Sequence, residues 1–263
     1  MANDFLPVDA RGLRVLVTAG AGGIGRVIAR AFAARGARIA VCDMDEAALA
    51  DVAEEQPEAL ALRADVAEEA QVEALFAAIR TRLGGLDVLV NNAGIAGPTA
   101  GIEGVTREAL ERTLAVDVVG LFLCAARAVP LLREAGGGSI INLGSVASRL
   151  GFPLRTPYSA AKWGVVGFTQ SLAIELGPER IRVNAILPGH VEGDRFARVV
   201  RAKAEAAGCS EAEMRRAMLD AVALKRTVAA EDIANMALFL ASPFGASISG
   251  QALSVCGGVQ MMR

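Results

Sequence analysis

The chain has 263 residues, of which 53% are hydrophobic and only 4% aromatic, so its core must be built from Ala, Val, Leu and Ile. The net charge of −2, without a basic stripe, argues against a nucleic-acid partner, and four scattered cysteines with a single histidine argue against a metal site or a disulfide framework. The first residues lack the pattern of a signal peptide and no uninterrupted 18-residue apolar run occurs, so we expect a cytoplasmic protein with no membrane span.

Short aliphatic runs along the chain predict buried strands at 13–18, 38–42, 59–63, 86–90, 139–143, 182–187 and 251–255. Helical periodicity between these runs predicts helices at 26–35, 46–55, 68–83, 107–134 and 157–176. Alternation of strands and helices is typical of βαβ units with parallel strands and right-handed crossovers. No linker or repeat interrupts it, so we expect one doubly wound α/β domain over residues 1–263.

The stretch between Gly189 and Ala229 departs from this alternation, because it predicts two helices, at 194–207 and 210–223, and no strand. One interpretation is an ordinary pair of surface helices. The other is a helical lid over a substrate pocket, around 190–228, since ligands of open α/β sheets bind beyond the carboxyl ends of the strands.

A glycine-rich turn, TAGAGGIG at 18–25, joins the first strand to the first helix. Glycines let the backbone approach a pyrophosphate closely, and the helix N-terminus offers free N–H groups. Asp43 ends the second strand, where a carboxylate can accept hydrogen bonds from ribose hydroxyls and would repel a 2′-phosphate. No Lys or Arg adjoins it, which favours NAD over NADP. Either Asp43 or Asp45 could instead cap the next helix, and Asp45 suits that position better.

Tyr158 and Lys162 are four positions apart in a predicted helix and therefore share a face. A nearby ammonium stabilises a phenolate, which lets the phenol exchange a proton with a substrate oxygen. The pair alone could equally be an exposed helix face. Ser145 follows the strand at 139–143, at the carboxyl edge of the sheet, where its hydroxyl could bind a substrate carbonyl.

With these residues the chain resembles the classical short-chain dehydrogenase/reductase family from Leu13 to about Gly258. The matching motifs occur in family order: TAGAGGIG at 18–25, DV at 65–66, NNAG at 91–94, Ser145, YSAAK at 158–162 and PG at 188–189. The resemblance implies a single-domain Rossmann fold with a seven-stranded parallel sheet flanked by helices. It also implies a CH–OH oxidoreductase that moves a hydride between NAD(H) and a secondary alcohol or ketone.

The resemblance further implies roles for individual residues. Tyr158 would be the acid/base, Lys162 would hold the nicotinamide ribose and Ser145 would orient the substrate. The expected cofactor-binding residues are Thr18, Gly20, Gly23, Ile24, Gly25, Asp43, Met44, Asp65, Val66, Asn92, Tyr158, Lys162 and Val191. A homotetramer or homodimer paired through the long helices is also implied, and the tail at 261–263 could dock on a neighbouring subunit.

Three positions depart from the family pattern. Ala19 replaces a glycine, so we expect its backbone to avoid positive φ. Asp117 stands where the family usually carries an asparagine that holds a water in the proton relay to Lys162, and we count it among the catalytic residues. Gly193 replaces a threonine that often contacts the cofactor.

The substrate pocket should be lined by residues around the catalytic helix and the lid, with substrate contacts expected at Ala147, Arg155 and His190. Further arginines should lie nearby, at Arg149, Arg195 and Arg198. Several arginines at one site could bind a carboxylate or phosphate, or could be solvated surface charge. His190 could hydrogen-bond the substrate or face water. The substrate itself is not determined by the sequence.

Three other functions were weighed against this one. A non-catalytic nucleotide-binding scaffold on the same fold is the main alternative, and the presence of Ser145, Tyr158 and Lys162 argues against it. An epimerase or dehydratase typically carries a longer substrate domain than 263 residues allow. A serine hydrolase lacks support because Ser145 lies outside a GxSxG motif and only His190 could serve as its base.

Overall fold

The fold is built around one seven-stranded parallel sheet, as the sequence predicts, in a computed structural model that describes residues 6–259. The strand order is β3-β2-β1-β4-β5-β6-β7, so the winding reverses between β1 and β4. In open α/β sheets a ligand crevice opens at that reversal. The strands are β1 (Arg14–Thr18), β2 (Arg38–Asp43), β3 (Leu60–Arg63), β4 (Val88–Asn91), β5 (Gly138–Leu143), β6 (Ile181–Pro188) and β7 (Ala252–Val255).

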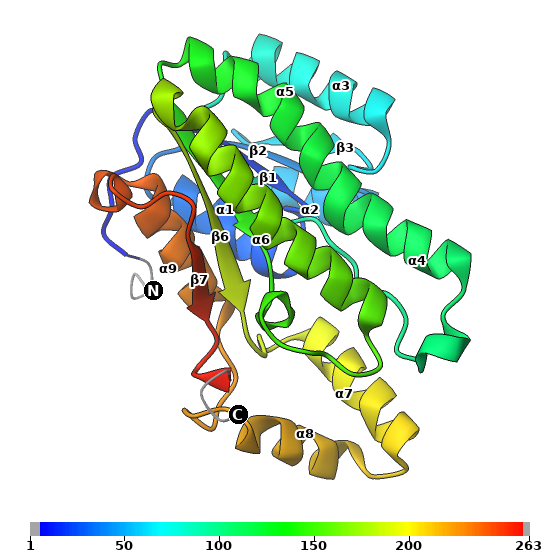
Figure 1. Ribbon diagram of the computed structural model, residues 1–263. Helices are drawn as coiled ribbons and strands as arrows, with labels where there is room; N and C mark the ends of the chain where they lie inside the picture. The colour runs from blue at the N-terminus through cyan, green and yellow to red at the C-terminus, as the bar shows by residue number, and fades with distance from the viewer. Residues whose placement is uncertain (1–5, 260–263) are drawn as a thin grey trace.

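Helices cover both faces of the sheet (Figure 1). One layer contains α1 (Gly23–Ala33), α2 (Glu46–Glu55) and α9 (Ala230–Ala241), and the other contains α3 (Glu69–Ala78), α5 (Gly120–Glu134) and α6 (Thr156–Leu176). Alternate strand residues point to opposite faces, so Leu16 joins the core under α5 while Val15 joins the core under α1. The sequence pattern predicted five of these six helices and missed α9.

The segment 107–134 is not the single regular helix that the sequence predicts. It consists of α4 (Arg107–Leu114), a π turn at Ala115–Val119 and α5, which accommodates Pro130. Among the described residues, this is the one helical stretch long and apolar enough to cross a membrane by length and composition. Half of its apolar window is buried inside the fold, where α5 packs on α3 and the sheet as a core helix.

A chain of buried polar side chains joins the two central strands to α6. The amide of Asn91 on β4 donates to Asn142 on β5 (3.0 Å), and Asn142 donates to Thr169 on α6 (2.9 Å). Thr169 in turn donates to the carbonyl of Val165 (2.7 Å). Buried polar groups need such partners, so these contacts fix α6 against the carboxyl half of β5.

The predicted lid region holds two helices, α7 (Asp194–Ala207) and α8 (Glu211–Asp220), which lie beyond the carboxyl ends of β6 and β7 (Figure 1). They pack on each other through a small apolar cluster around Phe196 and Met218. The sequence predicted no strand here, but an isolated parallel bridge joins Val191 to Val228. The backbone hydrogen bonds of the bridge, from Val228 to His190 (2.8 Å) and from Glu192 to Val228 (3.0 Å), hold the two ends of the lid together.

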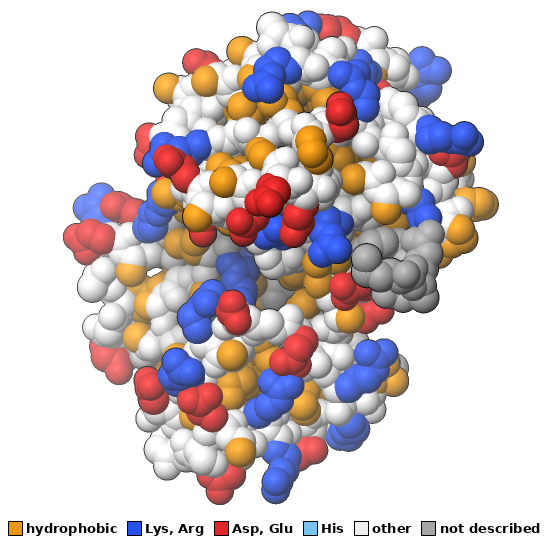
Figure 2. All heavy atoms as spheres, turned by 180° about the vertical axis from the view of Figure 1, so that it is seen from behind, with side chains coloured by type: hydrophobic (Ala, Val, Ile, Leu, Met, Phe, Trp, Pro, Cys, Tyr) orange, Lys and Arg blue, Asp and Glu red, His pale blue; other side chains and the backbone are white. Residues whose placement is uncertain are grey.

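The surface of the molecule carries charges of both signs. On the face shown in Figure 2, basic and acidic side chains are interspersed rather than gathered into a stripe of one sign. The predicted docking of the tail at 261–263 lies outside the described residues.

Candidate active site

A cavity of about 800 Å³ opens beyond the carboxyl ends of the central strands and is partly covered by α7. The glycine turn and Asp43 lie at one end, and Ser145, Tyr158 and Lys162 lie at the other. The expected site residues that line it are Gly23, Ile24, Asp43, Asn92, Ser145, Arg155, Tyr158, Lys162, His190 and Val191. The structure therefore brings the predicted cofactor end and the predicted catalytic end into one cavity.

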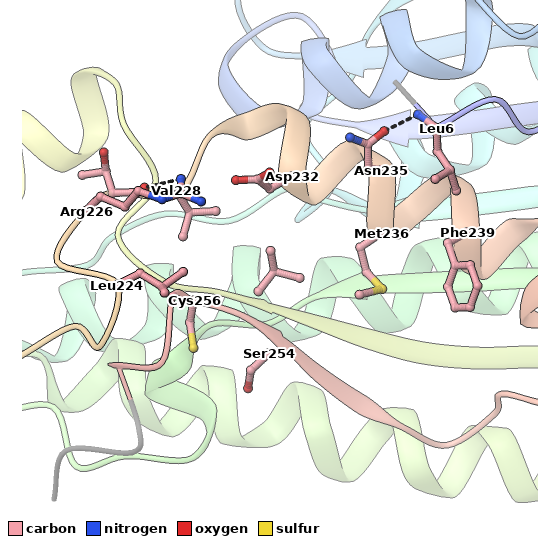
Figure 3. Close-up of a pocket in the computed structure, with 13 residues that line it drawn as sticks. Leu6, Leu224, Arg226, Val228, Asp232, Asn235, Met236, Phe239, Ser254 and Cys256 are labelled. Carbon is pink, nitrogen blue, oxygen red and sulfur yellow. Dashed lines mark hydrogen bonds between the residues drawn. The ribbon is translucent and has the colours of Figure 1, made fainter. Parts of the chain in front are cut away.

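A second cavity, of about 490 Å³, lies between α9 and β7 (Figure 3). Met236 and Phe239 from α9 and Ser254 and Cys256 from the end of the chain line it. None of the predicted site residues contributes to it. The predicted site residues therefore lie at the larger cavity and not at this one.

The glycine turn leaves the start of α1 open to the cavity. A side chain at Gly20 would place its Cβ 2.7 Å from the carbonyl oxygen of Val17, and one at Gly25 would place it 2.2 Å from that of Ala19. A Cβ at Gly22 or Gly23 would meet nothing within 4 Å. The N-terminus of α1 has no side-chain cap and no acidic residue in its first turn. An uncapped helix N-terminus beside glycines fits the pyrophosphate of a dinucleotide.

The expectation for Ala19 is wrong, because its φ is +47°. Neighbouring hydrogen bonds hold this strained conformation. The side-chain amide of Asn92 donates to the carbonyls of Thr18 (2.9 Å) and Ala19 (3.0 Å), and the N–H of Gly20 donates to Cys42 (3.0 Å). A left-handed residue persists where its surroundings determine it in this way.

Of the two acidic residues Asp43 and Asp45, it is Asp45 that caps the next helix. Asp45 caps α2 by accepting from the N–H of Ala48 (3.0 Å), as predicted. The carboxylate of Asp43 accepts from the N–H groups of Ala21 (3.2 Å) and Met44 (2.8 Å), which hold it at the edge of the cavity beside the glycine turn.

The region around Met44 and Asp65 contains an arginine that is already paired. Arg112 donates to the carboxylate of Asp65 (2.9 Å) and lies 3.9 Å from the sulfur of Met44. Asp65 also accepts from the N–H of Ala67 (3.0 Å), and Val66 is buried against Gly120. The remaining expected cofactor residues lie behind or beside the cavity wall rather than on it: Thr18, Gly20, Gly25, Met44, Asp65 and Val66.

Three of the four catalytic candidates come from two elements that meet at the end of β5. Ser145 starts a short 3₁₀ turn directly after the strand, and its Oγ accepts from the N–H of Ala147 (3.2 Å). Tyr158 and Lys162 lie on one face of α6, with the Lys162 Nζ 5.7 Å from the centre of the Tyr158 ring. Lys162 is buried and donates to the carbonyl of Leu143 (3.0 Å). A hydroxyl, a phenol and an ammonium so arranged can bind and protonate a carbonyl oxygen.

Asp117 lies behind Lys162 rather than on the cavity wall. The π turn directs its carboxylate inward, where Oδ1 accepts from the N–H of Ile95 (2.6 Å) and Oδ2 lies 3.4 Å from Nζ of Lys162. Both side chains of this ion pair are almost fully buried. Within residues 6–259, Oδ2 has no hydrogen-bond partner, so a lone pair remains for a water molecule.

His190 lines the cavity and stacks on Phe196, with ring centres 5.2 Å apart. Burial, aided by the positive charge of Lys203, lowers the pKa of His190 to about 4. The imidazole is therefore neutral at pH 7, able to donate or accept a hydrogen bond but not to carry charge.

Two of the expected pocket residues do not line the cavity. The 3₁₀ turn after Ser145 buries Ala147 completely, and its carbonyl accepts from the hydroxyl of Ser159 (3.3 Å). The same turn sends Arg149 to the carbonyl of Ala252. These two expectations need correction, whereas Arg155, His190, Arg195 and Arg198 do reach the cavity.

The pocket also has an apolar wall that the sequence motifs do not indicate. Phe196, Val199 and Met218 from the lid line it, together with Phe152 from the loop before α6. The helical spacing of Phe196, Val199 and Val200 was a signal that one face of α7 is apolar. The loop around Phe152 carries no such signal.

Comparisons with known proteins match nearly the whole length of the chain. The family model described as enoyl-(acyl carrier protein) reductase matches residues 19–260. A sorbitol dehydrogenase of Cereibacter sphaeroides is 39% identical over 94% of this chain and 97% of its own length. A galactitol 2-dehydrogenase of Agrobacterium fabrum is 38% identical over 92% of this chain and 95% of its own length.

Two solved structures have the same fold. Actinorhodin polyketide ketoreductase with NADPH superposes with a TM-score of 0.90 at 34% identity, covering 94% of this chain and 97% of the other. A 3-ketoacyl-(acyl-carrier-protein) reductase from Brucella melitensis complexed with NADH gives a TM-score of 0.86 at 34% identity, covering 95% and 99%. With its seven-stranded parallel sheet and these matches over nearly its whole length, the chain belongs to the classical short-chain dehydrogenase/reductase family.

Proposed function

We propose that this chain is a cytoplasmic oxidoreductase that transfers a hydride between NAD(H) and a secondary alcohol or ketone. One observation carries the proposal: a single cavity holds Ser145, Tyr158 and Lys162 at one end and an open helix N-terminus with Asp43 at the other. A dinucleotide bound along it would bring its nicotinamide to the catalytic end. The relatives named as sorbitol and galactitol dehydrogenases support an alcohol substrate.

The chemistry follows from the three side chains. In the direction of reduction, the Tyr158 hydroxyl gives its proton to the substrate carbonyl oxygen, and in oxidation the phenolate takes the proton of the alcohol. The Ser145 hydroxyl hydrogen-bonds the same oxygen and stabilises the charge that develops on it. The Lys162 ammonium, 5.7 Å from the Tyr158 ring, stabilises the phenolate. NAD(H), when bound, accepts or supplies the hydride.

Asp117 acts in this proposal as a positioning residue for Lys162. Its carboxylate is anchored by the N–H of Ile95 and lies 3.4 Å from Nζ of Lys162, while the carbonyl of Leu143 accepts from the same nitrogen. Two partners therefore hold the ammonium over the end of β5. Oδ2 of Asp117 can accept a further hydrogen bond. It could therefore hold the water of the proton relay to Lys162, as the asparagine of the family does.

The non-catalytic scaffold is the weaker candidate. A protein that only binds a nucleotide needs the glycine turn and Asp43, but not a buried lysine beside the single tyrosine of the chain. Burying an ion pair such as Lys162–Asp117 costs free energy, and a catalytic site is where such a cost is commonly retained.

The preference for NAD rests on charge. The Asp43 carboxylate stands where ribose hydroxyls would bind, and it would repel a 2′-phosphate. Arg112, the cation near Met44, already forms an ion pair with Asp65. Arg26 is likewise paired with Glu55 (2.8 Å). The ribose end therefore favours a cofactor with two free hydroxyls.

We also propose that the chain forms a homotetramer or homodimer through α5 and α6. Three large apolar side chains on these helices remain exposed: Phe122 by 51%, Trp163 by 51% and Ile174 by 82%. Phe122 packs on Phe168 across the two helices with ring centres 4.3 Å apart, so the apolar surface is continuous between them. A second copy of the same face would cover it.

Replacing Tyr158 with Phe should lower kcat by at least about 100-fold, because the proton donor is lost while the ring is kept. Reduced-cofactor absorbance with sorbitol, galactitol and other secondary alcohols measures turnover, and NADH fluorescence measures binding. Cofactor affinity should stay within about 3-fold of the unmodified protein. Full turnover in the variant would contradict the proposed mechanism, and no NADH binding by the unmodified protein would favour another function.

Asp117→Asn should keep kcat within about 10-fold, because an amide oxygen can still accept from Ile95 and interact with Lys162. Asp117→Leu should lower kcat further, since it leaves the buried ammonium with one partner fewer. The same assay with thermal melting of both variants measures this. Equal activity of the two variants would show that the acceptor at position 117 does not position Lys162.

Asp43→Ser should reduce the preference for NAD over NADP, measured as the ratio of the two kcat/KM values, by at least about 10-fold. Asp45→Ser is the matched control, because it lines the same end of the cavity but serves as the cap of α2. In the control, the ratio of kcat/KM with NAD to kcat/KM with NADP should stay within about 3-fold of that of the unmodified protein. An unmodified enzyme that prefers NADP would refute the role of Asp43.

Light scattering should give a mass of two or four times 27.2 kDa. The double variant Phe122→Glu and Ile174→Glu should reduce the measured mass toward that of a single chain, because it would bury charges at the interface. Ile102→Glu replaces an isoleucine that is 70% exposed outside α5 and α6, and it should leave the mass unchanged. A mass of 27.2 kDa for the unmodified protein would exclude the assembly.

A further inference from the structure

Arg155 is a buried cation beside the catalytic tyrosine. It immediately precedes α6, and only 3% of its surface is exposed. Its guanidinium carbon lies 4.8 Å from the centre of the Tyr158 ring and 5.9 Å from that of Phe152. Arg155 also lines the cavity, so its head group is in the wall of the site and not on the outer surface.

A backbone carbonyl, rather than a carboxylate, accepts the hydrogen bonds that the Arg155 guanidinium donates. Nε and Nη2 both donate to the carbonyl of Ala96, at 3.1 and 2.7 Å. Across residues 6–259, Nη1 makes no hydrogen bond and no carboxylate lies within 4.0 Å of the Arg155 head group. Burial lowers the pKa of Arg155, yet a guanidinium stays charged in a protein. A buried charge without a counter-ion is costly unless something else pairs with it.

The charges around Arg155 leave the catalytic end of the cavity positive. Lys162 is balanced by Asp117 at 3.4 Å. Glu192 is engaged by Arg215 (2.7 Å), and Asp194 is exposed in the first turn of α7. Two more arginines, Arg195 and Arg198, line the same cavity. After burial, which lowers the pKa of Arg155, Tyr158 raises it, Arg195 lowers it and Asp117 raises it, so Arg195 is close enough to act on this guanidinium.

The two acidic residues at the far end do not change this balance. Asp43 and Asp45 lie at the glycine turn and are held there by backbone N–H groups. They would face the ribose of the cofactor, whereas Arg155 faces the region in front of Tyr158. An anion that enters the catalytic end therefore meets a preformed cation next to the proton donor.

We infer that the substrate carries a carboxylate that pairs with Arg155, which makes it a hydroxy acid or the corresponding oxo acid. The inference rests on the proposed function and narrows its substrate class. Nη1 and one N–H of Nη2 of Arg155 remain available to donate to a carboxylate. Two parallel N–H donors of a guanidinium match the two oxygens of a carboxylate. Because the guanidinium lies against the Tyr158 ring, the carboxylate and the reacting carbon are separated by few bonds, as in 2- or 3-hydroxy acids.

Arg155 also has a structural function that the test must separate. Its two hydrogen bonds to Ala96 tie the loop after β4 to the start of α6. Loss of that tie would weaken binding of every ligand. Loss of a carboxylate partner would weaken binding of acids while leaving their neutral amides unaffected.

The experiment compares an acid with its amide, without requiring turnover. Isothermal titration of the NADH-loaded protein with butyrate and with butyramide should show the acid binding about 10- to 100-fold more tightly, as a charge-assisted pair does. Arg155→Met should abolish that ratio, and Arg155→Lys should retain part of it. Arg149→Met is the matched control, because Arg149 is exposed and hydrogen-bonds Ala252 outside the cavity.

Equal affinity of the unmodified protein for butyrate and butyramide would overturn the inference, and so would a ratio that survives in Arg155→Met. If Arg155→Met fails to bind NADH, the inference is tested by the ratio of butyrate to butyramide affinity in the unmodified protein and in Arg155→Lys.

Turnover is measured separately with 2- and 3-hydroxybutyrate, their amides and sorbitol. Turnover of sorbitol and the amides but not of the acids would leave the proposed function standing and overturn the hydroxy-acid substrate. Carboxylate binding without turnover of any alcohol would refute the proposed function while the carboxylate site stands.

Discussion

The position of α6 over the end of β5 is the constraint on which the whole site depends. The hydrogen-bonded chain from Asn91 through Asn142 to Thr169 crosses from the sheet to this helix inside the core. Any rotation of α6 about its axis would break these bonds and leave amides unsatisfied, at a cost well above that of a shifted apolar contact. The same helix rotation determines where Tyr158 and Lys162 point. A polar contact deep in the core therefore sets the geometry of the reaction at the surface.

The sheet and most of its helices could be predicted from the sequence because fully buried strands are short aliphatic runs flanked by glycine or polar residues. The motif residues likewise predicted that Asp43 and Ser145, Tyr158 and Lys162 share one cavity, since the carboxyl ends of parallel strands meet at one edge. α9 was missed, although Ile233, Ala234, Ala237 and Leu238 have helical spacing.

Other features could not be predicted because they depend on contacts distant in the sequence. The positive φ of Ala19 is held by the side chain of Asn92, far along the chain. Arg149 and Arg155 look alike as residues, but the 3₁₀ turn sends one to the outer strand while the other is buried against Tyr158. The π turn that directs Asp117 toward Lys162 leaves no mark in the apolar pattern.

The segment 190–228, with α7 and α8, is a closed loop, since the bridge between Val191 and Val228 joins its two ends before the chain returns to the sheet. Lengthening a closed loop adds only a small entropic cost, and changes within it do not alter the register of strands outside it. The residues of α7 and α8 can therefore diverge, by substitution or insertion, without disturbing Ser145, Tyr158 or Lys162. Such separation lets the wall that α7 and α8 give to the cavity change while Ser145, Tyr158 and Lys162 keep their positions.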